Sequence, residues 1–126
     1  MTRGLTLDAG ALIALENRSG RMQALLELAA KEGITLAVPA GVVAQVWRGG
    51  PRQSRIARLL LQRQVEEVAL TPGFARAIGL LIGRCGHRDV VDVSVALCAK
   101  ERGHTVVTSD PDDLRAIDPS ISLAEL

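Results

Sequence analysis

Three aspartates stand where a carboxylate could take part in catalysis or hold a metal ion. Asp8 follows a short apolar run at 5–7, and Asp110 follows the apolar run 105–108 with one residue between. Both runs predict buried strands, and ligands of open α/β sheets collect at the carboxyl ends of such strands. Asp92 lies near the start of a strongly apolar helix, where a lone carboxylate is costly unless it has a partner. We therefore expect Asp8, Asp92 and Asp110 to meet at one edge of a sheet.

Carboxylates that converge from separate segments repel one another unless a cation lies between them. The expected group contains no His or Cys, so its ligands are all hard oxygens, which suit Mg²⁺ or Mn²⁺ better than Zn²⁺. Such ions retain several waters and bind phosphate groups, and a metal-activated water can attack a phosphodiester bond. The residue types therefore indicate metal-assisted phosphodiester hydrolysis.

A structural interpretation competes for some of these acids. Asp89 and Asp92 have the spacing of an N-cap residue and an N3 acid, which interact with free N–H groups at a helix start. Asp110 precedes Pro111, a residue favoured at the first helical position, so the same explanation applies to it. Capping does not explain Asp8, which ends a strand and is followed by an expected turn.

The elements that would position these acids alternate between strands and helices. Strands are expected at 5–8, 34–38, 65–70, 105–108 and 121–123, and helices at about 11–17, 20–32, 40–47, 53–62, 72–85, 89–102 and 111–117. This alternation favours parallel βαβ units, and hence an α/β fold: a three-layer α/β/α sandwich around a central, mostly parallel sheet. At 126 residues, the chain is expected to form a single domain over 1–126.

Composition excludes several classes of protein. Apolar residues make up 48% of the chain, which is enough for a core. Trp47 and Phe74 are the only aromatic residues, so the chain cannot bind nucleic acid through a row of stacked rings. The formal net charge is +1, so any contact with nucleic acid must come from a local patch.

Compartment and membrane association follow from the cysteines and the hydropathy pattern. Cys85 and Cys98 are too few and wrongly spaced for a zinc site, and they are expected to be buried, reduced thiols. The longest charge-free stretch, 33–47, contains Pro39 and is too short to span a membrane. Asp8 lies where a signal peptide would be apolar. We therefore expect a cytoplasmic protein with no membrane association.

Three segments around the acids form a set: 8–15 (DAGALIAL), 92–99 (DVSVALCA) and 107–114 (VTSDPDDL). In order and spacing they resemble the acidic motifs of the PIN domain, and most closely those of the small VapC-type ribonuclease toxins of bacterial toxin–antitoxin pairs. The resemblance runs over nearly the whole chain. It implies a PIN-like fold and a Mg²⁺- or Mn²⁺-dependent endoribonuclease that cleaves RNA, is usually a homodimer, and is held inactive by a cognate antitoxin.

The same resemblance assigns roles to individual acids. Asp8, Asp92 and Asp110 match the family's metal-binding acids and are the expected catalytic residues. Asp113 matches an additional acid one helical turn after Asp110. Asp89, one turn before Asp92, is expected to join the metal site through a water.

Three polar residues are expected to support the acids. The hydroxyl of Thr108 or Ser109 is expected to orient a carboxylate or a bound water. Gln45 stands where the family commonly has a glutamate, in the helix after the second strand. An amide oxygen can accept a hydrogen bond from a metal-bound water, but it adds no negative charge and cannot act as a base. Our hypothesis is that Asp8, Asp92 and Asp110 suffice for the site.

Two other functions compete with the nuclease. In the first, the change at Gln45 has cost a PIN-like domain its activity and left a module that binds RNA or an antitoxin. In the second, the chain is a phosphoacceptor signalling domain, because these also place acids at strand ends. The second is disfavoured because a neighbouring acid at the first strand and a lysine at the last strand are both missing.

A basic segment precedes the third strand. Arg48, Arg52, Arg55 and Arg58 are followed by Arg63, with no acid between them. One interpretation is an ordinary solvated helix face. The functional alternatives are phosphate contacts that bring RNA to the acids, assigned to the first four arginines, or docking of an acidic antitoxin segment.

The remaining polar and aromatic candidates are expected to be structural. Trp47 is expected in the core or at a dimer interface rather than as a platform for bases. His87 and His104 are expected to face solvent or to cap helices, because neither fits into a catalytic pair.

Overall fold

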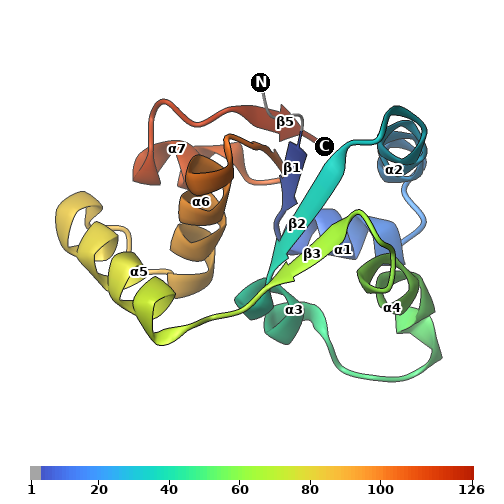
Figure 1. Cartoon of the computed structure of the whole chain (residues 1–126), viewed down its shortest axis with the longest axis horizontal. Helices are drawn as coiled ribbons and strands as arrows, with labels where there is room; N and C mark the ends of the chain where they lie inside the picture. Colours follow the sequence, from blue (N-terminus) through green and yellow to red (C-terminus); the bar gives the residue numbers. More distant parts are fainter. Residues whose placement is uncertain (1–3) are drawn as a thin grey trace.

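The computed structural model describes residues 4–126. Its strands are β1 (Gly4–Leu7), β2 (Thr35–Pro39), β3 (Val65–Val68), β4 (Thr105–Thr108) and β5 (Leu123–Glu125). They form one sheet in the order β3-β2-β1-β4-β5, and every neighbouring pair is parallel (Figure 1). The α/β prediction is confirmed, with a sheet that is parallel throughout.

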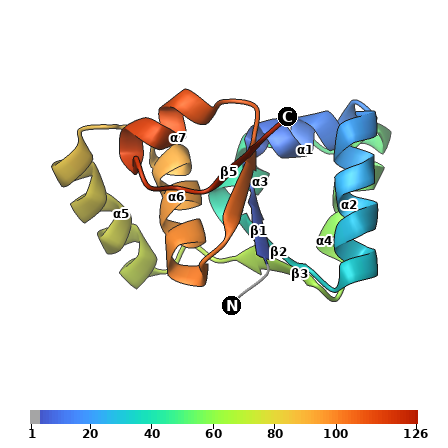
Figure 2. The ribbon, with the colours of Figure 1, turned by 90° about the horizontal axis from the view of Figure 1, so that it is seen from above.

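Helices cover both faces of this sheet. They are α1 (Ala9–Glu16), α2 (Gly20–Glu32), α3 (Ala40–Val46), α4 (Ser54–Leu60), α5 (Pro72–Cys85), α6 (Val90–Arg102) and α7 (Pro111–Ile117), with a 3₁₀ turn, η1 (Pro51–Gln53), before α4. Figure 2 shows α1, α2 and α4 on one side of the strands and α5, α6 and α7 on the other. The predicted three-layer arrangement is therefore confirmed.

The order of the strands places a crevice beside β1. The chain runs outward from β1 through β2 to β3, then returns through α5 and α6 to β4 on the other side of β1. Leu7 pairs with Val107, so β1 and β4 end side by side. Open parallel sheets bind ligands at such a reversal, outside the carboxyl ends of the strands.

Buried aliphatic side chains from both layers hold the sheet in place. Leu7, Leu36, Val38, Val106 and Val107 are almost completely buried on its central strands. Helices contribute a second set, which includes Leu12, Met22, Val42, Ile56 and Val93. This core fixes the strand ends, and with them the residues that follow β1 and β4.

Several predicted boundaries differ from the structure by one or two residues, and two of them have a clear physical cause. The turn expected after Asp8 is the first turn of α1, which begins at Ala9 because the side chain of Asp8 caps it. The last strand begins at Leu123 rather than 121, because it pairs with β4 from Val106 onward. Neither difference changes the order of the elements.

Three predictions about burial also need correction. Trp47 is 42% exposed, so it is not a core residue, and its place at a dimer interface stays a prediction. Cys98 is buried but Cys85 is only half-buried, and both are free thiols. The side chain of His104 does not face solvent: it is buried, and its Nδ1 lies 3.1 Å from the hydroxyl of Thr6. Only the backbone of His104 takes part in capping, because its N–H donates to the carbonyl of Ala99 at the end of α6.

The packing of His104 also explains a glycine. A Cβ at Gly4 would lie 2.1 Å from Nε2 of His104, so the strand can pass the ring only where the side chain is absent. Burial lowers the pKa of His104, and the nearby charge of Arg102 lowers it further. This imidazole therefore belongs to the packing at the start of the strands.

Within residues 4–126, no helix combines the length and the apolar character needed to cross a membrane.

Candidate active site

Five carboxylates line one cleft of about 410 Å³ at the carboxyl ends of β1 and β4. They belong to Asp8, Asp89, Asp92, Asp110 and Asp113. Other residues in the lining are Ala9, Gly10, Ile13, Gln45, Val46, Val91, Val95 and Ser109. The structure therefore brings together every acid that the sequence indicated, with Gln45 and Ser109 beside them.

Asp8 is held by the elements that it joins. Its backbone N–H donates to the carbonyl of Val107 at 3.3 Å, and its Oδ1 accepts from the N–H of Ala11 at 2.9 Å. Asp8 is thus the N-cap of α1, so the prediction that capping does not explain it was wrong. Burial raises the pKa of Asp8 above its ordinary 3.8, and hydrogen bonds from Thr108 and from the first turn of α1 offset this only in part.

Thr108 joins the ends of the two strands from beneath the cleft. The side chain is fully buried, and its hydroxyl accepts from the N–H of Asp110 at 2.8 Å. The same hydroxyl donates to the carboxylate of Asp8. One side chain therefore fixes the relative positions of Asp8 and Asp110.

Gly10 makes room for these acids. A Cβ at this position would lie 2.1 Å from Oγ of Ser109 and 3.3 Å from Oδ1 of Asp8. Any larger residue would push Ser109 away from α1 and crowd the carboxylate. The Gly after the first acid is therefore part of the site, although its sequence position indicated only a turn.

Asp92 has a partner that the sequence did not indicate. Its Oδ2 lies 3.1 Å from Nε2 of His87, in the loop before α6, so the prediction that His87 faces solvent or caps a helix was wrong. Burial raises the pKa of Asp92 above 3.8; the hydrogen bond with His87 lowers it in part, and the charges of Asp89 and Asp113 raise it again.

Capping is confirmed for Asp89 and is absent at Asp110. Oδ1 of Asp89 accepts from the N–H of Asp92 at 2.9 Å, which makes Asp89 the N-cap of α6. Asp110 stands at the N-cap position of α7, but its side chain makes no capping hydrogen bond. A hydrogen bond with Asp113 raises the pKa of Asp110, and the charges of Asp113 and Asp8 add to this effect. The carboxylate of Asp110 therefore lies next to other acids and does not cap the helix that follows it.

The sequence matches the PIN domain family over residues 5–118. The chain belongs to the PIN domain family. No curated protein sequence matches it at a significant level.

Solved structures with the same fold include chains from two kinds of complex. A chain of VapBC2 from Rickettsia felis, bound to a DNA fragment from its promoter, aligns with a TM-score of 0.74 and 19% identity over 97% of this chain and 98% of that one. A chain of FitAB bound to an IR36 DNA fragment aligns with a TM-score of 0.61 and 18% identity, covering 96% and 94%. A chain of FitAcB from Neisseria gonorrhoeae has a TM-score of 0.58 and 20% identity, covering 94% and 95%. At these identities the similarity is one of fold.

The donor set of this PIN domain suits a hard divalent cation. The cleft offers carboxylate oxygens, an amide and a hydroxyl, and its acids raise one another's pKa values, so a cation between them would relieve repulsion. Within residues 4–126, no three His, Cys, Asp or Glu side chains are already close enough together to hold a metal ion. Mg²⁺ commonly keeps several waters and takes only one or two carboxylates directly, so an open arrangement of acids is compatible with it.

The basic segment of this PIN domain lies outside the cleft. The guanidinium of Arg48 donates to the carbonyls of Trp47 and Ala44, at 2.7 and 3.2 Å, and is thereby folded against the end of α3. Arg52 and Arg55 line a different cavity, and Arg58 is exposed on α4. RNA contacts by these four arginines stay a prediction.

We expect the burial of Asp8 and Asp92, together with the charges that act on Asp92, to appear in the stability of the metal-free protein. The pKa values of Asp8 and Asp92 are higher in the folded chain than in the unfolded one. These groups therefore stabilise the fold below their unfolded pKa, and the contribution is lost as the pH rises through the folded pKa. Asp8→Asn removes one charge and keeps a good N-cap side chain. In EDTA at about pH 7 the variant should melt at a higher temperature than the wild type, by a margin that shrinks toward about pH 4.

Thermal denaturation followed by circular dichroism measures both proteins over this pH range. Saturating Mg²⁺ should raise the melting temperature of the wild type more than that of the variant, since a bound ion stabilises the folded state. A wild type that is at least as stable as Asp8→Asn in EDTA at neutral pH would show that the buried charge of Asp8 does not destabilise the fold.

Proposed function

We propose that this PIN domain is a Mg²⁺- or Mn²⁺-dependent endoribonuclease and the toxin of a VapBC-type toxin–antitoxin pair. The observation that carries the proposal is the cleft at the β1–β4 reversal, which five carboxylates line. The cleft contains no Ser–His or Cys–His pair that would indicate a covalent nucleophile. Metal-assisted attack by water is the chemistry that this set of residues supports best.

In this proposal Asp8, Asp92 and Asp110 hold the metal ion, and Asp113 and Asp89 contribute through water. The bound ion would supply an activated water and neutralise charge on the phosphate. Thr108 positions Asp8 against Asp110, and Ser109 faces the same space beside Gly10. Apolar walls from Ile13, Val91 and Val95 border the acids. In-line attack by water would leave a 5′-phosphate on the product.

The proposed partners follow from the family and from the structural similarity. The motifs resemble those of VapC-type toxins, and the fold aligns over nearly its whole length with a chain of the VapBC2 complex. We therefore propose a cognate antitoxin as protein partner, RNA as substrate, a homodimeric assembly and a cytoplasmic location.

The test of this function is incubation of the purified protein with single-stranded RNA in Mg²⁺, in Mn²⁺ and in EDTA. We expect cleavage only with the divalent ions, and products whose 5′ ends are substrates for a 5′-phosphate-dependent exonuclease. Cleavage that persists in EDTA, or its complete absence with either ion, would contradict the proposal.

Gln45 supports one alternative, a PIN domain that binds RNA or an antitoxin without cleaving. The side chain is exposed and lines the cleft, so it occupies the space in which a glutamate would add a charge. If the three central aspartates suffice, Gln45→Glu should raise Mg²⁺ affinity roughly tenfold, about 1.4 kcal/mol, by improving a site that already works. Calorimetric titration with Mg²⁺ and a cleavage assay measure the two effects.

Gln62→Glu is the matched control, because Gln62 is exposed, lies outside the cleft, and acts as a hydrogen-bond acceptor for Gln64. It adds the same charge and should change neither metal affinity nor cleavage. Cleavage that appears only after Gln45→Glu, with no Mg²⁺ uptake by the wild type, would favour the binding module over the nuclease.

A further inference from the structure

A second polar cavity, of about 320 Å³, lies at the other end of α1 from Asp8. Glu16, Asn17 and Arg18 line it from the end of that helix. Pro51, Arg52, Ser54 and Arg55 line it from η1 and the start of α4. Three arginines from two separate parts of the chain therefore face one space.

These three arginines have no anionic partner among the residues that the structure describes. Within residues 4–126, the guanidinium groups of Arg18, Arg52 and Arg55 make no ion pair or hydrogen bond, whereas Arg102 binds Glu66 and Arg115 binds Asp112. Glu16 is the one acid in the lining, so the cavity carries a net charge of two positive units by the sum of three arginines and one glutamate. Unpaired guanidinium groups that converge on one cavity form a site for an anion.

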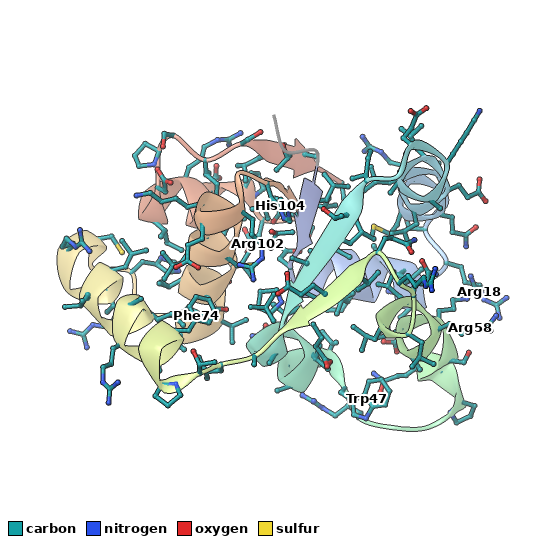
Figure 3. All side chains as sticks on the ribbon, viewed as in Figure 1. Arg18, Trp47, Arg58, Phe74, Arg102 and His104 are labelled. Atoms are coloured by element: carbon teal, nitrogen blue, oxygen red, sulfur yellow. The ribbon has the colours of Figure 1, made fainter. Side chains whose placement is uncertain are left out.

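The chain holds two of these arginines in defined positions. Arg18 has φ of +61°, a left-handed conformation that is sterically unfavourable for a non-glycine residue. The turn is retained because the N–H of Arg18 donates to Leu15 and the next residue caps α2. Strained residues of this kind are concentrated at functional sites. In Figure 3, Arg18 and Arg58 project at the same edge of the molecule, beside α4.

Arg52 is fixed through the loop that precedes it. The side chain of Gln53 is buried: its Oε1 accepts from the N–H groups of Arg48 and Gly49, and its Nε2 donates to the carbonyl of Val46. Val46 itself borders the acidic cleft. The loop thus ties the position of Arg52 to the wall of the candidate active site.

The two cavities lie along the same face of α1. Ile13 lines the acidic cleft and Glu16 lines the arginine cavity, and residues three apart are neighbours on one helix face. Asp8 and Asn17 are nine residues apart, about 14 Å along a helix at 1.5 Å per residue. A stacked nucleic-acid strand advances about 3.4 Å per nucleotide, so this distance corresponds to roughly four nucleotides.

We propose that Arg18, Arg52 and Arg55 bind a backbone phosphate of the RNA strand, about four nucleotides from the phosphate that would be cleaved at the acidic cleft. This inference rests on the proposed function. Guanidinium groups match phosphate oxygens in a bidentate geometry. An acidic peptide is disfavoured as the occupant, because the lining has no large apolar or aromatic residue to anchor one. The protein would therefore require a substrate that extends beyond the cleavage point on one side.

Binding by the Asp8→Asn protein tests this without cleavage. Fluorescence anisotropy would measure its affinity for an RNA of about 12 nucleotides and one of about 3, in Mg²⁺ and over a range of salt. Adding Arg52→Gln and Arg55→Gln should weaken binding of the long RNA about tenfold. It should also reduce the slope of log affinity against log salt concentration by about 0.7, the value for one lost phosphate contact on a single strand. The short RNA should bind equally to both proteins. The charge-matched control replaces Arg76 and Arg84, two exposed arginines of α5, by Gln, and it should change neither value.

The two proposals fail in distinguishable ways. An unchanged affinity and salt slope for the long RNA would overturn the arginine site, whether or not the wild type cleaves RNA. The same proteins are also titrated with a poly-glutamate peptide. If Arg52→Gln and Arg55→Gln abolish binding of this peptide and leave RNA binding intact, the site binds a protein partner and the RNA proposal is overturned. Weaker binding of the long RNA, with unchanged binding of the short RNA, would support the arginine site. It would do so even if the wild type did not cleave RNA, because that second result contradicts only the proposed nuclease activity. Circular dichroism should show folded variants, because within residues 4–126 neither guanidinium makes a hydrogen bond or an ion pair.

Discussion

Asp8→Asn is expected to reduce metal-dependent RNA cleavage at least about 100-fold, since loss of a direct ligand should exceed the 10- to 100-fold effect of residues that only support ligands. Asp8 is the most enclosed of the acids, and its carboxylate lies between the ends of β1 and β4. Asparagine keeps the oxygen that caps α1 at Ala11 but removes the charge that would bind the cation. The defect should therefore be chemical and leave the fold intact.

Asp112→Asn is the control for this prediction. Asp112 lies in the first turn of α7, next to Asp113, but it pairs with Arg115 and does not line the cleft. Initial rates of cleavage at saturating Mg²⁺ should be near those of the wild type for Asp112→Asn and close to background for Asp8→Asn. Equal rates in the wild type and Asp8→Asn would remove Asp8 from the site.

Thr108→Val is expected to lower cleavage about 10- to 100-fold, as the loss of a residue that orients metal ligands commonly does. Valine has the same shape, so the packing of β4 should survive. The N–H of Asp110 would lose its acceptor, and Asp8 would lose a donor that now lowers its pKa. Mg²⁺ affinity should fall with the rate, and the acidic limb of the pH–rate profile should move to higher pH because Asp8 would release its proton less readily.

Two further threonine variants separate this role from a general loss of stability. Thr108→Ser keeps the hydroxyl and should restore most of the rate and the original pH profile. Thr105→Val removes a hydroxyl that pairs with Ser122 at the opposite end of the same strand, and it should leave both unchanged. A Thr108→Val protein with normal Mg²⁺ affinity and an unshifted profile would mean that the hydroxyl does not position Asp8.

The fold was predictable because its signals are local. Short aliphatic runs separated by helical spacing identify β1, β2 and β4 within one or two residues, and Gly33 and Gly103 end their helices as expected. Placing Asp8 beside Asp110 required only that β1 and β4 be adjacent and parallel, which the structure confirms. The predicted start of the edge strand β5 was too early, because pairing with β4, rather than the strand's own apolar residues, sets where it begins.

The parts that the sequence did not predict depend on contacts between distant or irregular segments. His87 reaches Asp92 because the loop before α6 folds back over the helix start, and no periodicity reports such a loop. Gly10 is constrained by Ser109, which lies 99 positions later in the chain. Arg18 lies beside Arg52 and Arg55 only because α1 packs against α4. The spacing of arginines in the basic segment therefore could not indicate that Arg18 lines the same cavity.

The central claim is that the cleft formed by Asp8, Asp92 and Asp110 is a site for a divalent cation. The most direct measurement is anomalous diffraction from crystals of the wild-type protein grown with Mn²⁺ near neutral pH. We predict an anomalous peak within coordination distance of these carboxylates, and no peak there in Asp8→Asn crystals. A cleft without Mn²⁺ in the wild type, with Mn²⁺ bound only elsewhere on the protein, would contradict it.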